Sequence, residues 1–249
     1  MNDNKVVIVM PAYNAGSTLK KTYESIPNHL KSNVLVVDDN SRDDTVAVAK
    51  SLGLNVYIHE KNLGYGGNQK TCYTEALRLG ADIIIMLHPD YQYPAELIPA
   101  MVAMIEYGGY DVCLGSRILC GQARSGHMPV YKYYANRILT LLENWLTGAK
   151  LSEYHTGFRA YKRSVLESIN FNKNSNDFIF DNQFILQVMA KRFKIGEISS
   201  SCRYFQEASS INLLRSAKYG LECLYWGFLY LLGRFGIFYH PLIFNADSH

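Results

Sequence analysis

Short apolar runs alternate with amphipathic segments over the first 117 residues of the chain. Runs rich in β-branched residues predict five strands, at Lys5–Met10, Val34–Val37, Val56–His59, Asp82–Leu87 and Asp111–Leu114. The segments between them have helical spacing, at Ser17–Ile26, Asp43–Leu52, Gly67–Leu79 and Pro94–Tyr107. This alternation predicts an α/β fold whose central sheet is mostly parallel and carries helices on both faces.

The pattern becomes less regular after residue 117. Glycine, proline and basic residues between 118 and 129 predict a loop, and helices are expected at Tyr131–Leu146 and Phe178–Lys194, the second of them amphipathic. Phe158–Lys162 is a further candidate strand, and Ile195–Ser201 is expected to be an edge strand.

The C-terminal tail, Leu221–Phe244, is apolar and aromatic. A helix needs ~20 predominantly apolar residues to span a membrane, and only 11 uncharged positions separate Glu222 from Arg234. The pattern therefore favours an amphipathic helix lying in a membrane interface. The alternative is a helix that docks on the protein's own core.

Composition narrows the class of protein. The 249 residues are 48% hydrophobic and 19% charged, as in globular proteins, and a net charge of +3 is too small to indicate nucleic-acid binding. Five scattered cysteines without a Cys-x-x-Cys spacing argue against a disulfide framework or a zinc cage and favour a reducing compartment. A polar N-terminus without a signal peptide suggests the cytoplasm.

Polar residues follow three of the predicted strands. Pro11, Tyr13 and Asn14 come after the first, Asp38 and Asp39 after the second, and His88 to Gln92 after the fourth. The carboxyl ends of neighbouring parallel strands meet at one edge of a sheet, where ligands bind. Paired carboxylates suit ribose hydroxyls or a base edge, although one of them could equally cap a helix.

A glycine-rich stretch, Lys61–Asn68, follows the third strand. Its glycines would allow backbone N–H groups to approach a ligand at a helix start. It is neither the Gly-x-Gly-x-x-Gly fingerprint nor a P-loop, so a dinucleotide dehydrogenase or an NTPase is disfavoured.

In order along the chain, PAYN, VLVVDDNS, NLGYGGN, HPDYQYP, GSR and HTGFRAY resemble the motifs of glycosyltransferase family 2. The similarity runs from about Lys5 to Phe205, and the branch that it resembles is the dolichyl- or polyprenyl-phosphate sugar transferases. The resemblance implies a GT-A fold, a nucleotide-sugar donor, Mg²⁺ or Mn²⁺, and inversion at the anomeric carbon. Residues 1–211 would form this domain, with a nucleotide-sugar half at about 1–117 and an acceptor half at about 118–211, followed by a helical tail at 212–249.

The resemblance also implies roles for individual residues. Asp90 and Gln92 would bind the metal, and Asp90, Arg117 and Lys132 would act in catalysis, Arg117 as a phosphate ligand. The nucleotide-sugar residues would be Pro11, Tyr13, Asn14, Asp38, Asp39, Asn62, Gly64, Gly66, His88 and Asp90. The acceptor residues would be Arg124, His127, Lys132, Asn136 and Arg159.

His88 departs from the family pattern, because it stands where the family has the first aspartate of Asp-x-Asp. A neutral imidazole could ligate Mn²⁺ or hydrogen-bond to ribose, and the negative charge at the metal falls by one. The replacement also leaves open a nucleotide-sugar-binding subunit with impaired catalysis.

The nature of the acceptor decides whether a general base is needed. A lipid phosphate is already ionised near neutral pH and needs only cations to position it, whereas a sugar hydroxyl requires a carboxylate base, for which Glu153 and Asp181 are candidates. The favoured interpretation is transfer from a GDP- or UDP-hexose to a polyprenyl or dolichyl phosphate at the cytoplasmic membrane face. Transfer to a sugar hydroxyl is the alternative. With either acceptor, the protein could form a homo-oligomer or bind a membrane-protein partner.

Overall fold

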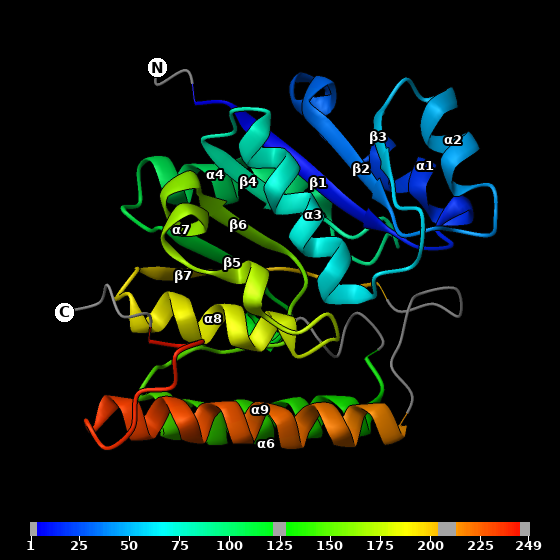
Figure 1. The fold of residues 1–249 in the computed structure, drawn as a ribbon. Coiled ribbons are helices and arrows are strands. Elements are labelled where there is room, and N and C mark those ends of the chain that lie inside the picture. Colours follow the sequence, from blue (N-terminus) through cyan, green and yellow to red (C-terminus); the bar gives the residue numbers. More distant parts are fainter. Residues whose placement is uncertain (1–3, 122–127, 204–212, 245–249) are drawn as a thin grey trace.

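The computed structural model describes residues 4–121, 128–203 and 213–244, which form a seven-stranded sheet covered by helices on both faces (Figure 1). The strand order is β3-β2-β1-β4-β6-β5-β7. The strands are β1 (Val6–Ala12), β2 (Val34–Asp38), β3 (Asn55–Ile58), β4 (Ile83–Met86), β5 (Val112–Ser116), β6 (Arg159–Lys162) and β7 (Ile195–Ser199). The predicted α/β class is confirmed, and the last strand lies at the edge of the sheet as expected.

The helices of more than one turn within the described residues pack on the sheet or in a layer outside it. They are α1 (Gly16–Glu24), α2 (Thr45–Ser51), α3 (Tyr65–Arg78), α4 (Ile98–Glu106), α6 (Val130–Thr147), α7 (Arg163–Ser168), α8 (Phe180–Ala190) and α9 (Leu213–Arg234). Short 3-10 turns lie at Asn28–Asn33, Ala95–Leu97, Leu119–Gly121 and Phe171–Lys173. Helix α7 was not expected from the sequence.

Alternate side chains of β1 enter two separate cores, because successive residues of a strand point to opposite faces. Ile8 and Met10 pack with α1, α2 and α4, whereas Val7 and Val9 pack with α3 and α8. Both faces are therefore buried, which explains why the strand reads as a continuous apolar run.

The sheet is parallel except at β6, which pairs antiparallel with β4 on one side and with β5 on the other. This strand begins at Arg159, within the motif HTGFRAY, and carries the preceding loop to the carboxyl end of β4. The pairing of β6 with β4 brings His155 and Gly157 next to the strand tips, although about seventy residues separate them from β4 in the sequence.

Helix α8 is not amphipathic, so that part of the sequence interpretation was wrong. Its residues from Phe180 to Val188 are all buried, Asp181 among them. One side of the helix packs on α3 and the sheet. On the other side, Leu186 contacts Leu229 and Ile243 of the C-terminal segment. A helix enclosed between two layers loses the polar stripe that a surface helix keeps.

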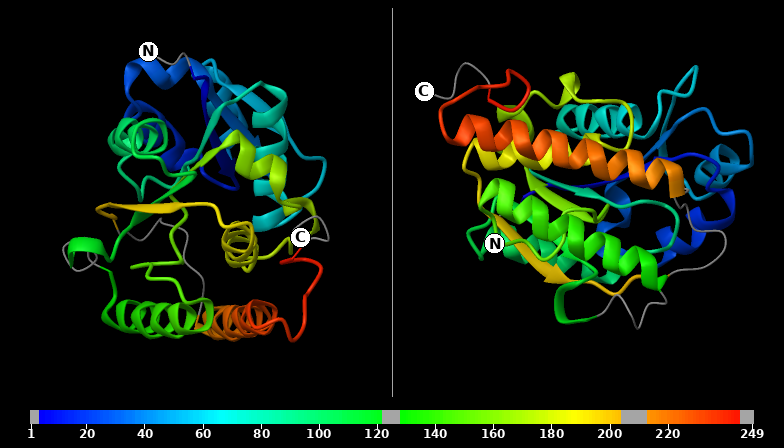
Figure 2. Two further views of the ribbon diagram at one scale, coloured as in Figure 1. Left: turned by 90° about the vertical axis from the view of Figure 1, so that its left-hand side faces the viewer. Right: turned by 90° about the horizontal axis from the view of Figure 1, so that it is seen from below.

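Helices α6 and α9 lie side by side in an outer layer below α8 (Figures 1 and 2). Gly227 allows α9 to approach α6 closely, since a Cβ at this position would lie 2.9 Å from Leu146 Cδ1. The C-terminal helix thus docks on the protein's own core through one face. Within the described ranges, none of the helices combines the length and apolarity that crossing a bilayer would need.

Candidate active site

The carboxyl ends of β2, β1 and β4 meet at one edge of the sheet, as the sequence predicted, because these three strands are adjacent and parallel. A cavity of about 550 Å³ opens there, and we call it the strand-tip cavity. Residues from all three tips line it, together with the glycine-rich stretch, the loop before α8, and α9. They are Pro11, Tyr13, Asn14, Ala15, Ser17, Thr18, Asp39, Asn62, Gly64, Tyr65, Asn68, His88, Pro89, Asp90, Asn176, Asp177, Phe178 and Arg215.

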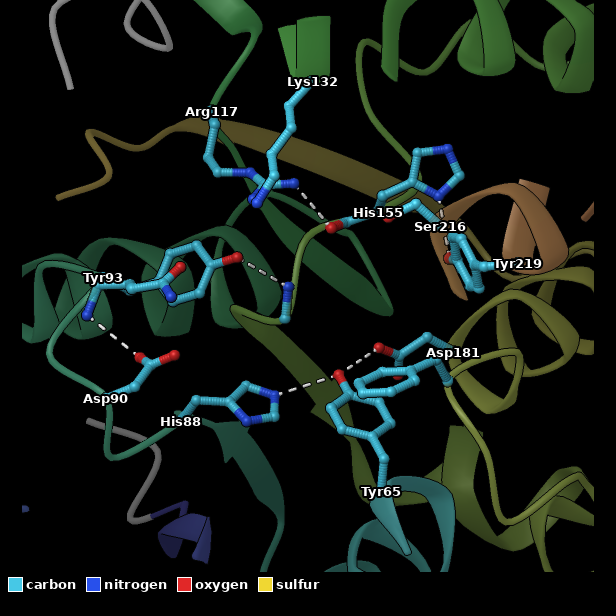
Figure 3. Close-up of a pocket in the computed structure, with 13 residues that line it drawn as sticks. Tyr65, His88, Asp90, Tyr93, Arg117, Lys132, His155, Asp181, Ser216 and Tyr219 are labelled. Atoms are coloured by element: carbon cyan, nitrogen blue, oxygen red, sulfur yellow. Dashed lines mark hydrogen bonds between the residues drawn. The ribbon is translucent and has the colours of Figure 1, made fainter. Parts of the chain in front are cut away.

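A second cavity of about 240 Å³, the helix-side cavity, adjoins the first (Figure 3). Four residues line both, namely Tyr65, His88, Asp90 and Phe178. The helix-side cavity is otherwise lined by Gln92, Tyr93, Arg117, Lys132, His155, Gly157, Asp181, Ser216 and Tyr219. Two ligands could therefore meet beside Asp90, one in each cavity.

Asp39 organises the glycine-rich stretch. Its carboxylate accepts hydrogen bonds from the backbone N–H groups of Leu63 (2.7 Å) and Gly64 (3.0 Å), and it contacts His59 Nδ1 at 2.8 Å. Gly64 has a φ of +82°, and a Cβ there would lie 2.8 Å from the Asn176 carbonyl oxygen. One of the two carboxylates expected to bind ribose hydroxyls or a base edge thus already makes hydrogen bonds that shape the cavity wall.

Two of the predicted nucleotide-binding residues lie outside the strand-tip cavity. Asp38 is buried and accepts a hydrogen bond from the backbone of Ser41 at 3.0 Å. A Cβ on Gly66 would lie 2.4 Å from the Ser175 carbonyl oxygen, so this glycine serves close packing of α3 on the loop before α8. The other eight predicted residues, including His88 and Asp90, line the cavity.

His88 lies between Tyr65 and Gly157 at the junction of the two cavities. Its Nε2 is 3.3 Å from the Tyr65 hydroxyl, and that hydroxyl donates a 2.7 Å hydrogen bond to Asp181. A Cβ on Gly157 would lie 2.7 Å from His88 Cδ2, so the glycine of HTGFRAY makes room for the imidazole. Burial lowers the pKa of His88 and outweighs the opposing effect of Asp90. The ring is therefore neutral near pH 7.

The donor atoms beside this imidazole suit a divalent metal. Asp90 lines both cavities and supplies a carboxylate, and Gln92 supplies an amide next to it. Mg²⁺ is held in proteins by one or two carboxylates together with substrate phosphates, and an imidazole extends the set toward Mn²⁺. Because this tip offers a single carboxylate, firm metal binding would depend on oxygens from a diphosphate.

Arg117 and Lys132 bring cationic groups to the helix-side cavity. The Arg117 side chain is held by Glu153 through its Nε (2.8 Å) and Nη2 atoms, and Nη2 also donates to the His155 carbonyl at 2.8 Å. Burial alone would raise the pKa of Glu153, but Arg117 and hydrogen bonds from Arg117 and Asn136 lower it. Glu153 is fully buried and does not line either cavity, so it is unsuited to act as a base.

Arg159 does not reach the acceptor side, contrary to its predicted role. It is fully buried, and its guanidinium donates to the backbone carbonyls of Thr156, Asp181 and Tyr154. Its Nη1 also lies 3.5 Å from Asp181 Oδ1. Asn136 also points away from the acceptor side: its Nδ2 donates a 2.8 Å hydrogen bond to Glu153 Oε1, and the residue does not line the helix-side cavity. Arg124 and His127 lie outside the described residues.

Sequence reasoning missed several residues that line these cavities. Tyr65 lies within the recognised glycine-rich motif and was not assigned a role. Arg215, Ser216 and Tyr219 come from the first turns of α9, ahead of the apolar segment Leu221–Phe244 that the sequence assigned to a membrane interface or to the protein's own core. No local signal marks them, because helix packing brings them to the site.

A family model matches residues 7–169, and its description is glycosyl transferase family 2. The chain belongs to this family. Among curated relatives, the UDP-N-acetylglucosamine–dolichyl-phosphate N-acetylglucosaminyltransferase of Methanococcus voltae is 26% identical over 80% of this chain and 85% of its own. The dolichyl-phosphate hexose transferase of Haloferax volcanii is 28% identical over 78% and 80% of the two chains.

Solved structures support the GT-A fold class of this glycosyltransferase. Glucosyl-3-phosphoglycerate synthase from Mycobacterium tuberculosis, solved with Mn²⁺, UDP-glucose and glycerol 3-phosphate, superposes with a TM-score of 0.69. The match covers 94% of this chain and 81% of the synthase at 18% identity, so it establishes the fold alone.

Proposed function

We propose that this glycosyltransferase moves a hexose-type sugar, with inversion, from a nucleoside diphosphate to a polyprenyl phosphate at a cytoplasmic membrane surface. Two curated relatives are named as dolichyl-phosphate sugar transferases and a third as a polyprenol monophosphomannose synthase, which supports this acceptor class. The observation that carries the proposal is the helix-side cavity. It offers Arg117 and Lys132 beside Asp90, and its wall includes α6 and α9.

The carboxylates near this cavity argue against a sugar hydroxyl as the acceptor. Glu153 is paired with Arg117, and Asp181 receives hydrogen bonds from Tyr65 and from Gln69 (3.1 Å) and lies near Arg159. A base for a hydroxyl must be within reach of its proton and have capacity to accept it. An ionised phosphate oxygen needs no such base, only cations that position it.

In the proposed arrangement the donor occupies the strand-tip cavity and the acceptor phosphate lies between Arg117 and Lys132. The phosphate oxygen attacks the anomeric carbon while the bond from that carbon to the nucleoside diphosphate breaks. A divalent ion bound by Asp90 and Gln92 would offset the charge that develops on the leaving diphosphate. The neutral imidazole of His88, between Tyr65 and Gly157, would form one wall of the space in which the sugar lies.

Transfer to matched acceptors tests this proposal. With a panel of UDP- and GDP-sugars and Mn²⁺, the purified protein should glycosylate a short polyprenyl phosphate and leave the polyprenol of equal length unmodified. Mass spectrometry of the lipid extract identifies the product. Transfer to a sugar hydroxyl without transfer to the phosphate would contradict the acceptor assignment, and nucleotide binding without any turnover would contradict the enzyme.

We further propose that α6 and α9 rest on the membrane. On α6, side chains spaced by three and four residues are each at least 59% exposed, at Tyr131, Tyr134, Ile138, Leu141 and Trp145. A similar exposed stripe on α9 consists of Leu221, Tyr225 and Phe228. Helices with aromatic and aliphatic outer faces bind at lipid interfaces. The cavity wall formed by Lys132, Ser216 and Tyr219 adjoins this layer, so a lipid phosphate could enter from the bilayer.

Charged substitutions on the outer face of α6 should weaken membrane binding. The double variant Leu141→Glu, Trp145→Glu should lower partitioning onto vesicles of anionic phospholipid at least ~10-fold, because each large apolar side chain contributes about 1.5–3 kcal/mol when buried. Cosedimentation measures the partitioning. Tyr107→Glu, at a 76% exposed tyrosine after α4, is the matched control. Equal partitioning of both variants and the wild type would exclude this face as the lipid contact.

A further inference from the structure

A cluster of two buried side chains and one partly buried side chain lies between α6, α9 and the loop before β6, outside the donor and metal residues described above. Glu143 comes from α6, His155 from the loop and Cys223 from α9. Glu143 is 1% exposed and Cys223 is fully buried. One carboxylate oxygen, one imidazole nitrogen and the sulfur all lie within 4.8 Å of one another.

The contact between Glu143 and His155 is close but is not a hydrogen bond. His155 Nε2 lies 3.0 Å from Glu143 Oε2, and both atoms are buried. Within the described part of the chain, neither atom has a hydrogen-bond partner. Buried polar atoms are rarely left in this state, because an unmade hydrogen bond costs about 1–3 kcal/mol. A metal ion bound to both atoms would explain why they lie 3.0 Å apart without a hydrogen bond between them.

Neighbouring side chains orient the two ligands toward a common point. Asn182 donates to Glu143 Oε1, which leaves Oε2 for another partner. The Tyr219 hydroxyl lies 3.0 Å from His155 Nδ1. When Nδ1 donates its proton to that hydroxyl, Nε2 presents a lone pair. Imidazole ligands of metals are commonly fixed in this tautomer by a partner on the other nitrogen.

We propose that Glu143, His155 and Cys223 bind one Zn²⁺ ion. A thiolate, an imidazole and a carboxylate form the mixed donor set that zinc accepts, whereas Mg²⁺ and Ca²⁺ require oxygen ligands. The ion would also balance the charge of a buried glutamate, which has no lysine or arginine within 4.0 Å among the described residues. The fourth position of a tetrahedral ion would be left to water.

The zinc ion would attach α9 to α6 and to the loop before β6. His155 and Tyr219 both line the helix-side cavity, and the His155 carbonyl accepts a hydrogen bond from Arg117. Fixing Cys223 on α9 to His155 would therefore hold the residues that α9 contributes, Ser216 and Tyr219, at the acceptor side. The role is structural and is independent of the metal at Asp90.

Cobalt substitution tests the site without using enzyme activity. The full-length protein, free of any affinity tag, should take up one equivalent of Co²⁺ with a thiolate-to-cobalt charge-transfer absorption, and Zn²⁺ should displace it. Asp90→Asn should behave identically, which separates this site from the donor metal. Cys223→Ser should lose the charge-transfer band, and Glu143→Gln should weaken Co²⁺ binding at least tenfold. Cys113→Ser replaces another buried cysteine, on β5, and should bind like the wild type.

Thermal unfolding provides a second measurement. Zinc should raise the Tm of the wild type and of Cys113→Ser and leave that of Cys223→Ser unchanged, because a ligand of the native state stabilises it by mass action. A folded wild-type protein that shows no cobalt–thiolate band on titration would overturn the proposal. Equal zinc stoichiometry in Cys223→Ser and the wild type would do the same, because the bound zinc would then not depend on this thiolate.

Discussion

Asp90→Asn should lower kcat/KM for sugar transfer by about 10²–10³-fold while the protein remains folded. The carboxylate of Asp90 borders both cavities and is the one acidic metal ligand proposed at the tip of β4. A metal that stabilises a leaving diphosphate contributes several kcal/mol, and roughly 3–4 kcal/mol corresponds to this loss. Steady-state kinetics across Mg²⁺ and Mn²⁺ concentrations measure the effect, and circular dichroism verifies the fold.

Glu96→Gln is the matched control for this substitution, because it also removes one negative charge close by in sequence. Glu96 is exposed and lies outside the lining of both cavities, so its replacement should leave kcat/KM within twofold of the wild type. If Asp90→Asn retained wild-type rates at every metal concentration, the metal assignment would be wrong. A uniform loss in both variants would instead indicate a general electrostatic effect.

Arg159→Met should destabilise the protein by about 3–5 kcal/mol, because it leaves a buried carboxylate without its cation. Arg159 is fully buried, donates to three backbone carbonyls and lies 3.5 Å from Asp181. Methionine preserves much of the side-chain volume, so the loss would come from electrostatics and hydrogen bonding. Equilibrium unfolding in urea measures the free energy of unfolding.

A surface arginine provides the comparison for this stability effect. Arg78 forms a 3.3 Å ion pair with Glu75 on α3 and its side chain is 77% exposed. Arg78→Met should cost less than about 0.5 kcal/mol, as exposed pairs usually do. If Arg159→Met unfolded at the wild-type urea concentration and raised only the KM for the acceptor, the acceptor role predicted from sequence would be restored.

Strand positions and the family were accessible from sequence because their signals are local. Runs such as Asp82–Leu87 can be buried only within a sheet that is covered on both faces, and the observed β4 lies inside this range. The ordered motifs then identified glycosyltransferase family 2, which the family model confirms. The convergence of the three strand tips followed from the rule for parallel sheets and was also confirmed.

Roles of single charged residues were harder to predict, since they depend on what lies across the fold. Asp39 belongs to a motif, but its partners are backbone groups of the glycine-rich stretch. Arg159 also belongs to a motif, but it is the first residue of β6 and its side chain is fully buried. Asp181 was a candidate base, yet α8 lies between two layers and the carboxylate is contacted by Tyr65, Gln69 and Arg159.

By itself, the sequence determined the α/β architecture, the family and the edge of the sheet that bears the site, because hydrophobic period and motif order are properties of neighbouring residues. Only the tertiary structure decided which charges face a cavity and which face each other. It placed α9 on α6 and α8, brought Arg215 and Tyr219 to the cavities, and gathered Glu143, His155 and Cys223 although no cysteine spacing suggested a metal site. The physical reason is that burial and charge pairing are set by packing between elements distant in sequence.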